Sequence, residues 1–284
     1  MKNSGFKYKH PGTADVTIFS ICISKSDWTC AKHNETNDTA FEKMQKNRFD
    51  ILPVREADGT FKKYFKTNEW GNFEVNEINI LEIKPKDCID QLSGIKDVIK
   101  EFAIAERDRN FFFLTNEKEV VGMLTAGNLN SKHVYIYLYN LISQLEFELG
   151  RLISRSGIDD NELVRIFEEN NKSVKPNIRY RREIKKGLDH KFIEFAYIGD
   201  MAWIIRQKNL HRKIGMSAKD FDSSIKLINK LRNIVAHPVN SLIKGKNSIV
   251  ELDLTISKID ILNTKIRSYI SGEHGRNLRT EWKN

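Results

Sequence analysis

The pattern of hydrophobic and polar positions changes near residue 132. Before that point, short runs of β-branched and aromatic residues alternate with turn residues, which predicts strands over residues 16–23, 49–54, 111–114 and 120–124. After it, apolar residues recur at steps of three and four, which predicts one long helix from residue 134 that stops before Gly157, and helices over residues 161–167, 192–205 and 218–236. Residues 249–254 have a strand-like or extended pattern, and residues 256–270 have a helical one.

The first half contains an internal repeat. A helix, a strand, a polar turn and a second strand follow one another twice, with the turns at residues 56–59 and 116–119. The second half lacks this order and is mostly helical. We therefore expect an α+β protein, with an α/β domain over residues 1–132 and a helical domain over residues 133–284.

The net charge of +9 is confined to the second half. Residues 1–132 carry 20 basic and 20 acidic side chains, whereas residues 133–284 carry 27 basic and 18 acidic ones. The densest stretch, residues 172–213, holds 12 basic and four acidic side chains. This distribution indicates either an RNA-binding surface or a solvated basic face. The candidate RNA-binding residues are Arg179, Arg181, Arg182, Lys185 and Lys186.

Membrane, secreted and metal-binding classes find no support in the sequence. The most apolar stretch, residues 134–142, is far shorter than the roughly 20 residues of a membrane span. The N-terminal lysines are not followed by the apolar segment of a secretory signal. The three cysteines lack zinc-site or disulfide-framework spacing. We expect a cytoplasmic protein without membrane contact and without a metal cofactor.

The end of the second repeat carries a candidate phosphate-binding motif, the segment Gly122-Met-Leu-Thr-Ala-Gly-Asn-Leu129. Gly122 permits close backbone approach, Thr125 offers a hydroxyl and an N–H near a helix start, and Asn128 can bond a hydroxyl group. A threonine that only caps its own helix would have the same sequence pattern.

This segment resembles the nucleotide motif of the cystathionine beta-synthase (CBS) domain, which usually occurs as a tandem pair. The resemblance covers roughly residues 14–131 and includes the strand at residues 49–54 with Asp58-Gly59. It implies that Gly122, Thr125 and Asn128 bind an adenine nucleotide, AMP, ATP or a related molecule, as a regulatory ligand. The first repeat departs from the motif, with Tyr64 in place of the glycine and Trp70 in place of the ribose-binding residue. Many CBS pairs serve only in dimerisation.

Three pairs in the second half have the spacing Arg-x4–6-His, so the spacing alone identifies none of them. The pairs are Arg206 with His211, Arg232 with His237, and Arg267 with His274. Only Arg232 and His237 enclose a mainly apolar interior at the end of a long amphipathic helix. Asn233 follows the arginine directly and stands four residues before His237, so its amide can orient the imidazole.

The pair resembles the Arg-x4–6-His signature of the HEPN domain, a four-helix family found in many metal-independent ribonucleases and toxins. The resemblance implies cleavage of RNA by its own 2′-hydroxyl, with Arg232 stabilising the phosphate, His237 moving the proton and a homodimer forming the site. Glu146 and Glu148 are candidates for a further acidic residue. The structural alternatives are a helix-ending His237 bonded to a carbonyl and an ion pair of Arg232 with Asp220 or Asp222.

The predicted function is a nucleotide-regulated, metal-independent endoribonuclease that acts in defence or stress. Two alternatives stay open. In one, the protein is a non-catalytic homodimeric regulator or RNA-binding module with structural Arg232 and His237. In the other, it is a toxin held by an antitoxin partner.

Overall fold

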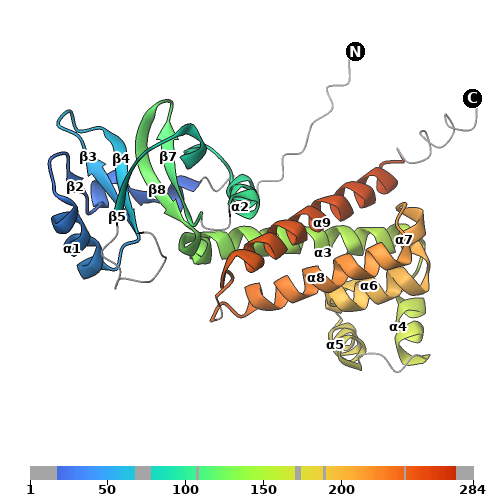
Figure 1. The fold of residues 1–284 in the computed structure, drawn as a ribbon. Coiled ribbons are helices and arrows are strands. Elements are labelled where there is room, and N and C mark those ends of the chain that lie inside the picture. Colours follow the sequence, from blue (N-terminus) through green and yellow to red (C-terminus); the bar gives the residue numbers. More distant parts are fainter. Residues whose placement is uncertain are drawn as a thin grey trace, which may run out of the picture. The chain divides into compact units, whose positions relative to one another are not determined.

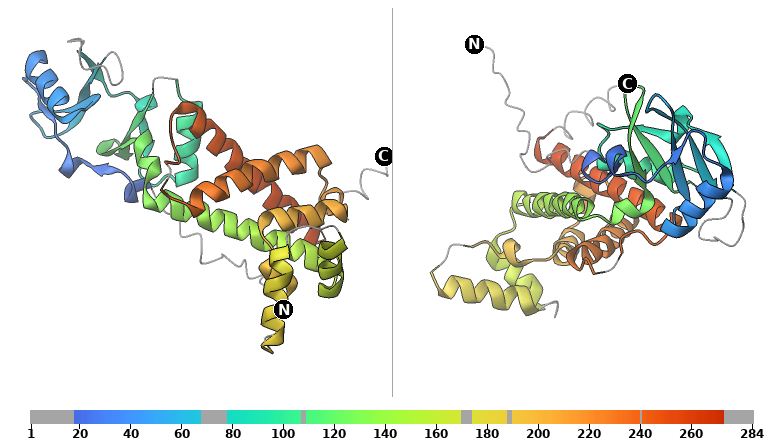
Figure 2. Two further views of the ribbon diagram at one scale, coloured as in Figure 1. Left: turned by 90° about the horizontal axis from the view of Figure 1, so that it is seen from below. Right: turned by 90° about the vertical axis from the view of Figure 1, so that its left-hand side faces the viewer.

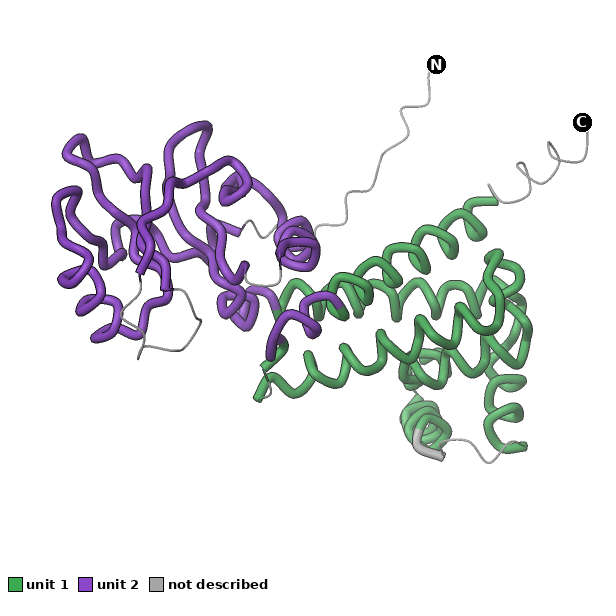
Figure 3. Tube along the Cα trace, in the orientation of Figure 1, with its two compact units in different colours: residues 1–13, 135–242, 251–284 green, residues 14–134, 243–250 purple. Residues whose placement is uncertain are grey.

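Two compact units make up the chain in the computed structural model, which describes residues 18–67, 78–106, 109–169, 174–187, 190–239 and 241–272 (Figure 3). Among these residues, the α/β unit takes in 18–134 and 243–250, and the helical unit takes in 135–242 and 251–272. Helices α3 and α9 each begin in the α/β unit and continue in the helical one. No sequence pattern indicated that residues 243–250 group with the α/β unit.

The α/β unit is built from two copies of one strand–helix–strand–strand motif (Figure 1). In each copy a helix joins two parallel strands, and a hairpin leads to an antiparallel third strand. Gly59, at φ 80°, supplies the left-handed residue of the first hairpin. The predicted internal repeat is confirmed. The first copy is β2 (Ala31–Lys32), α1 (Asn37–Asn47), β3 (Ile51–Arg55) and β4 (Phe61–Thr67), and the second is β6 (Cys88–Asp90), α2 (Ile95–Ile104), β7 (Phe111–Asn116) and β8 (Glu119–Thr125).

Each copy gains a fourth strand from outside the motif. Strand β5 (Ile78–Glu82) extends the first sheet in the order β2-β3-β4-β5, and β1 (Ile23–Ser24) extends the second in the order β1-β8-β7-β6. The strand expected over residues 16–23 was wrong, because residues 18–20 form a 3-10 helix and only its last residue lies in β1. Ile18 and Ile21 are both buried, and this three-residue spacing fits a tight helical turn rather than alternation.

The cores of the α/β unit lie on the faces of the two sheets. Residues from both sheets share one aromatic cluster, in which the Tyr64 ring lies 5.4 Å from the rings of Phe111 and Phe113. Trp28 completes the cluster against Phe61, at 4.9 Å between ring centroids. Helix α1 packs on Leu52, Val54 and Phe65 of the first sheet. The two hairpins are thus held together by ring contacts.

The helical unit consists of seven helices and one 3-10 segment among its described residues (Figure 2). The two longest of these helices, α3 and α9, have their first residues in the α/β unit. No described helix is both long and apolar enough to cross a membrane. The helices are α3 (Lys132–Arg155), α4 (Asp160–Glu169), α5 (Val174–Lys185), α6 (Ile198–Gln207), α7 (Leu210–Lys213), α8 (Ala218–Ala236) and α9 (Lys246–Ile270), with the 3-10 segment η5 (Phe192–Phe195) before α6.

The structure corrects two boundaries in the helical half. The extended segment expected over residues 249–254 is part of α9, because Ile249, Leu252, Ile256 and Ile259 are buried at helical spacing. The helix expected over residues 192–205 is split into η5 and α6. The prediction of an α+β fold with a mainly helical second half is confirmed.

Candidate functional site

Arg232 lies on the last turns of α8 and is held by two neighbours from other helices. Buried Phe221, Ile228 and Leu231 fix the helix. The guanidinium lies over the ring of Tyr197, 5.4 Å from its centroid, and its Nε is 3.7 Å from Oε1 of Glu146 on α3. No hydrogen bond from this guanidinium is found among the described residues, so its fork of donors stays open.

Glu146 and Glu148 have different environments although they lie on the same helix. Glu146 is the acid that faces Arg232, and burial raises its pKa above the ordinary value while Arg232 acts to lower it. Glu148 is 3% exposed at its side chain and accepts hydrogen bonds from Arg267 (2.9 Å) and Arg151 (3.0 Å). Glu146 therefore belongs to the surroundings of Arg232, and Glu148 links α3 to α9.

His237 is the residue at which α8 ends. Its backbone N–H donates to the carbonyl of Ile234, and its φ and ψ of −127° and 73° leave the helical region. The expected hydrogen bond between Asn233 and His237 is absent among the described residues, because the side chain of His237 no longer continues the helical face. Both side chains are exposed. The imidazole is thus open to solvent and free of side-chain partners within the described chain.

Another of the Arg–His pairs, Arg206 with His211, has its two side chains in direct contact. Arg206 Nη1 lies 3.1 Å from His211 Nε2, and Arg206 Nε lies 2.9 Å from Oδ1 of Asp222. His211 is 1% exposed and packs beside Phe221. A histidine buried this deeply is inaccessible to a polymer, so this pair is structural. Asp222 is thereby occupied by Arg206 rather than by Arg232.

The candidate RNA-binding residues lie on α5 and the turn after it, a helix that the apolar pattern did not predict. Arg179 donates to the Tyr197 hydroxyl at 2.7 Å and lies 5.6 Å from the centroid of its ring. Arg181 pairs with Glu168, and Lys186 pairs with Glu183 at 2.8 Å. Arg182 and Lys185 are exposed and have no ion pair among the described residues. Tyr197, which sequence reasoning did not single out, therefore joins Arg179 to Arg232.

The nucleotide motif forms a closed turn at the end of β8. The backbone N–H and the hydroxyl of Thr125 both donate to Oδ1 of Asn128, at 2.8 and 2.7 Å, at the start of the 3-10 helix η4 (Ala126–Asn130). Gly122 lies against β1, where a Cβ would be 3.2 Å from both Cys22 Sγ and the carbonyl oxygen of Ile23. The packing of β8 against β1 thus explains why this position is a glycine.

The first repeat differs at the position equivalent to Gly122. Tyr64, at the position of Gly122, is 5% exposed and fills the aromatic cluster, where burial raises its pKa. Trp70 lies outside the described residues.

The turn after the nucleotide motif binds the segment that begins α9. Asn130 Nδ2 donates to the carbonyl of Ile243 at 3.2 Å, and the N–H of Ile243 donates to Asn130 Oδ1 at 2.8 Å. Lys246 Nζ donates to the carbonyls of Phe102 and Ala105 at the end of α2, the latter at 2.8 Å. Both contacts are internal to the α/β unit.

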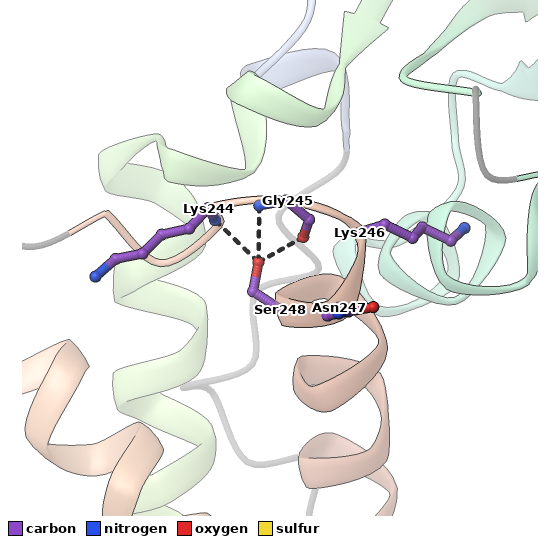
Figure 4. Close-up of a pocket in the computed structure, with 5 residues that line it drawn as sticks. All are labelled: Lys244, Gly245, Lys246, Asn247 and Ser248. Atoms are coloured by element: carbon purple, nitrogen blue, oxygen red, sulfur yellow. Dashed lines mark hydrogen bonds between the residues drawn. The ribbon is translucent and has the colours of Figure 1, made fainter.

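A small cavity of about 470 Å³ lies over the same segment and is lined by residues 244–248 (Figure 4). Ser248 Oγ accepts from the N–H groups of Lys244 and Gly245 at 2.9 and 3.1 Å. The local backbone donors are therefore used within the loop itself. Among the described residues, no three His, Cys, Asp or Glu side chains gather as metal ligands do.

Comparisons with known proteins find solved structures that are similar to part of the chain, and two of them are described here. No protein-family model and no curated protein matches the sequence. A CBS domain protein of unknown function from Thermoplasma acidophilum is 18% identical, covers 44% of this chain and 75% of its own, and gives a TM-score of 0.31. A hemolysin-like protein containing a CBS domain from Oenococcus oeni is 12% identical, covers 40% and 88%, and gives 0.30. Both neighbours contain CBS domains. Neither description names a ligand.

Proposed function

We propose that the chain is an endoribonuclease whose helical unit cleaves RNA and whose α/β unit, a CBS-like pair, regulates it by binding an adenine nucleotide. One observation carries the ribonuclease proposal. Arg232 is oriented by the Tyr197 ring and faces the half-buried Glu146 at 3.7 Å, yet its guanidinium donates no hydrogen bond within the described part of the chain. A guanidinium fixed in this way is suited to bind a phosphate group through two parallel hydrogen bonds.

The chemistry follows from these groups and from RNA itself. The 2′-oxygen attacks the adjacent phosphorus, the bond to the 5′-oxygen breaks, and the products end in a 2′,3′-cyclic phosphate and a 5′-hydroxyl. His237 accepts the 2′-proton or donates one to the leaving oxygen, and Arg232 stabilises the charge that builds on the phosphate. Since the nucleophile belongs to the substrate, no metal is needed to generate it. Each imidazole performs one of the two proton transfers, so a homodimer supplies both.

The regulatory proposal rests on what surrounds Thr125 and Asn128. A nucleotide that takes hydrogen bonds from these two side chains has to break the bonds between them, and this rearranges η4. The next residues of η4 include Asn130, which holds Ile243 just before α9. Helix α3 begins at Lys132, two residues after η4. A change in this turn therefore reaches the start of both helices that continue into the helical unit.

RNA cleavage in EDTA tests the function. Purified wild-type protein, His237→Ala and the matched control His133→Ala, an exposed histidine at the start of α3, are compared on end-labelled RNA. We expect 2′,3′-cyclic phosphate ends from the wild type and from His133→Ala but not from His237→Ala. Equal cleavage by all three would assign the activity to a contaminant. Addition of AMP or ATP, repeated with Asn128→Ala, tests regulation.

One observation favours a second function. His237 has no side-chain partner that orients it among the described residues, as expected in a non-catalytic, RNA-binding homodimeric regulator. RNA binding without cleavage by a folded wild-type dimer would select this function. An antitoxin that co-purifies with the protein would leave the chemistry unchanged and add a partner.

A further inference from the structure

A groove in the helical unit is lined by side chains that suit a single nucleic-acid strand. Its volume is about 730 Å³, within the range of roughly 300–1,000 Å³ that holds small organic ligands. All its residues belong to the helical unit. They are Glu146, Phe147, Gly150, Arg151, Ser154 and Arg155 from α3, Lys191, Ile193, Glu194 and Ala196 around η5, Met201 from α6, and Ile270 from α9.

Two cations of the groove are uncommitted. Arg155 and Lys191 are exposed and form no ion pair among the described residues. Of the two acids, Glu194 lies 2.8 Å from His190, and Glu146 faces Arg232. The acids are therefore directed to partners, whereas both cations are available to an anionic ligand.

An exposed aromatic ring also lines the groove. Phe147 is 58% exposed, and Arg151 lies 5.8 Å from its ring centroid. Arg151 also donates to Glu148, which limits its movement. An accessible ring with a fixed guanidinium is a surface on which a nucleobase stacks, because every base has a π-face.

One residue of the groove contacts the candidate catalytic residue Arg232. Glu146 lines the groove, and the same carboxylate lies 3.7 Å from Nε of Arg232. Gly150 also lines it and lies beside Ile193, because a Cβ on Gly150 would be 3.6 Å from Cγ1 of Ile193. A strand bound along the groove would therefore reach the surroundings of Arg232.

We propose that this groove binds a single-stranded RNA segment, with a base stacked on Phe147 and phosphates on Arg155 and Lys191. The proposal rests on the proposed ribonuclease function, because it assigns the substrate track of that same site. Stacking on Phe147 requires an unpaired base, which excludes an intact duplex. An acidic peptide would satisfy the cations but would leave the exposed ring without a π-partner.

Binding of a fluorescein-labelled single-stranded RNA, followed by anisotropy, tests the proposal. All variants carry His237→Ala so that cleavage does not consume the probe. We expect Phe147→Leu to weaken binding about tenfold with an unchanged salt slope. We expect Arg155→Gln with Lys191→Gln to weaken binding and to reduce the slope by about 1.4, as for two lost phosphate contacts on a single strand. Lys213→Gln with Lys226→Gln, which removes two exposed cations outside the groove, is the matched control.

Three outcomes overturn the groove proposal. The first is equal loss in the groove and control pairs, the second is a base-paired duplex bound as tightly as the single strand, and the third is full displacement of RNA by a polyglutamate peptide. Thermal unfolding of each variant confirms the fold. Loss of binding in groove variants of a protein without cleavage would retain the groove and reject the ribonuclease. Cleavage that depends on His237 but not on the groove residues would support the ribonuclease and reject the groove as its RNA-binding site.

Discussion

Asn130 and Ile243 lie 113 residues apart in the chain and hold each other through two hydrogen bonds. The bonds run between the amide side chain of Asn130 and both backbone groups of Ile243, because the amide carries a donor and an acceptor side by side. They attach residues 243–250 to the α/β unit, although the sequence neighbours on both sides belong to the helical unit. Together with the bonds from Lys246 to Phe102 and Ala105, they hold the start of α9.

Asn130→Ala should lower the free energy of unfolding by about 1–3 kcal/mol, because it leaves two backbone groups of the buried Ile243 without partners. Urea denaturation measures the change. The matched control is Asn247→Ala, an exposed asparagine of the same segment, for which we expect less than about 0.5 kcal/mol. Equal effects of the two substitutions would show that the Asn130 bonds contribute nothing.

Gly122→Ala should destabilise the second sheet by about 1–3 kcal/mol, since the new Cβ would lie 3.2 Å from the backbone oxygen of Ile23 and from Cys22 Sγ. Thermal unfolding measures the loss. Gly127→Ala is the control, because its Cβ would meet only the Thr125 hydroxyl, at an ordinary 3.5 Å. If both variants melt alike, Gly122 is not needed for the packing of β1.

Much of the α/β unit could be predicted from the sequence, because hairpins and their turns are encoded locally. The repeat follows from the alternation of apolar and polar residues, and the turn follows from the positive φ that Gly59 adopts easily. The short strand β1 could not be predicted, since its place depends on contact with β8, about a hundred residues later. Helix α5 was missed because its pattern is dominated by charge, with few apolar positions to reveal a period.

The candidate site was predictable only in its parts. The apolar interior at the end of a long helix, not the spacing, selected Arg232 over Arg206, and in the structure the His211 of the Arg206 pair is buried. Tyr197 had no sequence signal, because its role is to bring together arginines from α5 and α8. A contact between residues that are distant in sequence has no characteristic spacing, so the sequence pattern does not predict it.

Glu148→Gln should reduce stability by about 1–3 kcal/mol, because the buried carboxylate accepts charge-assisted hydrogen bonds from Arg151 and Arg267. Cleavage per folded molecule should fall less than in Arg232→Gln, since Glu148 bonds Arg151 and Arg267 rather than Arg232. Glu169→Gln is the control. Glu169 is exposed and lies 3.7 Å from Arg165, so we expect a change below about 0.5 kcal/mol. A loss of cleavage without loss of stability would place Glu148 in the active site instead.

Glu146→Gln should change how stability depends on pH. Burial raises the pKa of Glu146 above its ordinary value of 4.5, so the folded protein binds more protons than the unfolded chain above that pH. The contribution of Glu146 to stability is then fully present below 4.5 and is lost as the pH rises through the raised pKa. The glutamine variant avoids this loss, and we expect it to gain stability relative to wild type as the pH rises from 4.5 through the raised pKa.

Urea denaturation at several pH values measures this difference. Arg232→Gln provides the second arm, because it removes the charge that lowers the pKa of Glu146. The loss of stability should then occur at higher pH than in the wild type. Identical pH profiles for wild type and Glu146→Gln would contradict the burial argument.

Substitutions of Tyr197 should separate the role of its ring from that of its hydroxyl. Tyr197→Phe keeps the ring beside Arg232 and removes only the acceptor of the 2.7 Å bond from Arg179, so cleavage should stay within about threefold of wild type. Tyr197→Leu removes the π-face that orients Arg232, and cleavage should fall about tenfold. Initial rates on labelled RNA measure both. Tyr139→Leu, at an exposed tyrosine of α3, is the control and should retain the full rate. Full activity of Tyr197→Leu would mean that Arg232 is oriented by Glu146 alone.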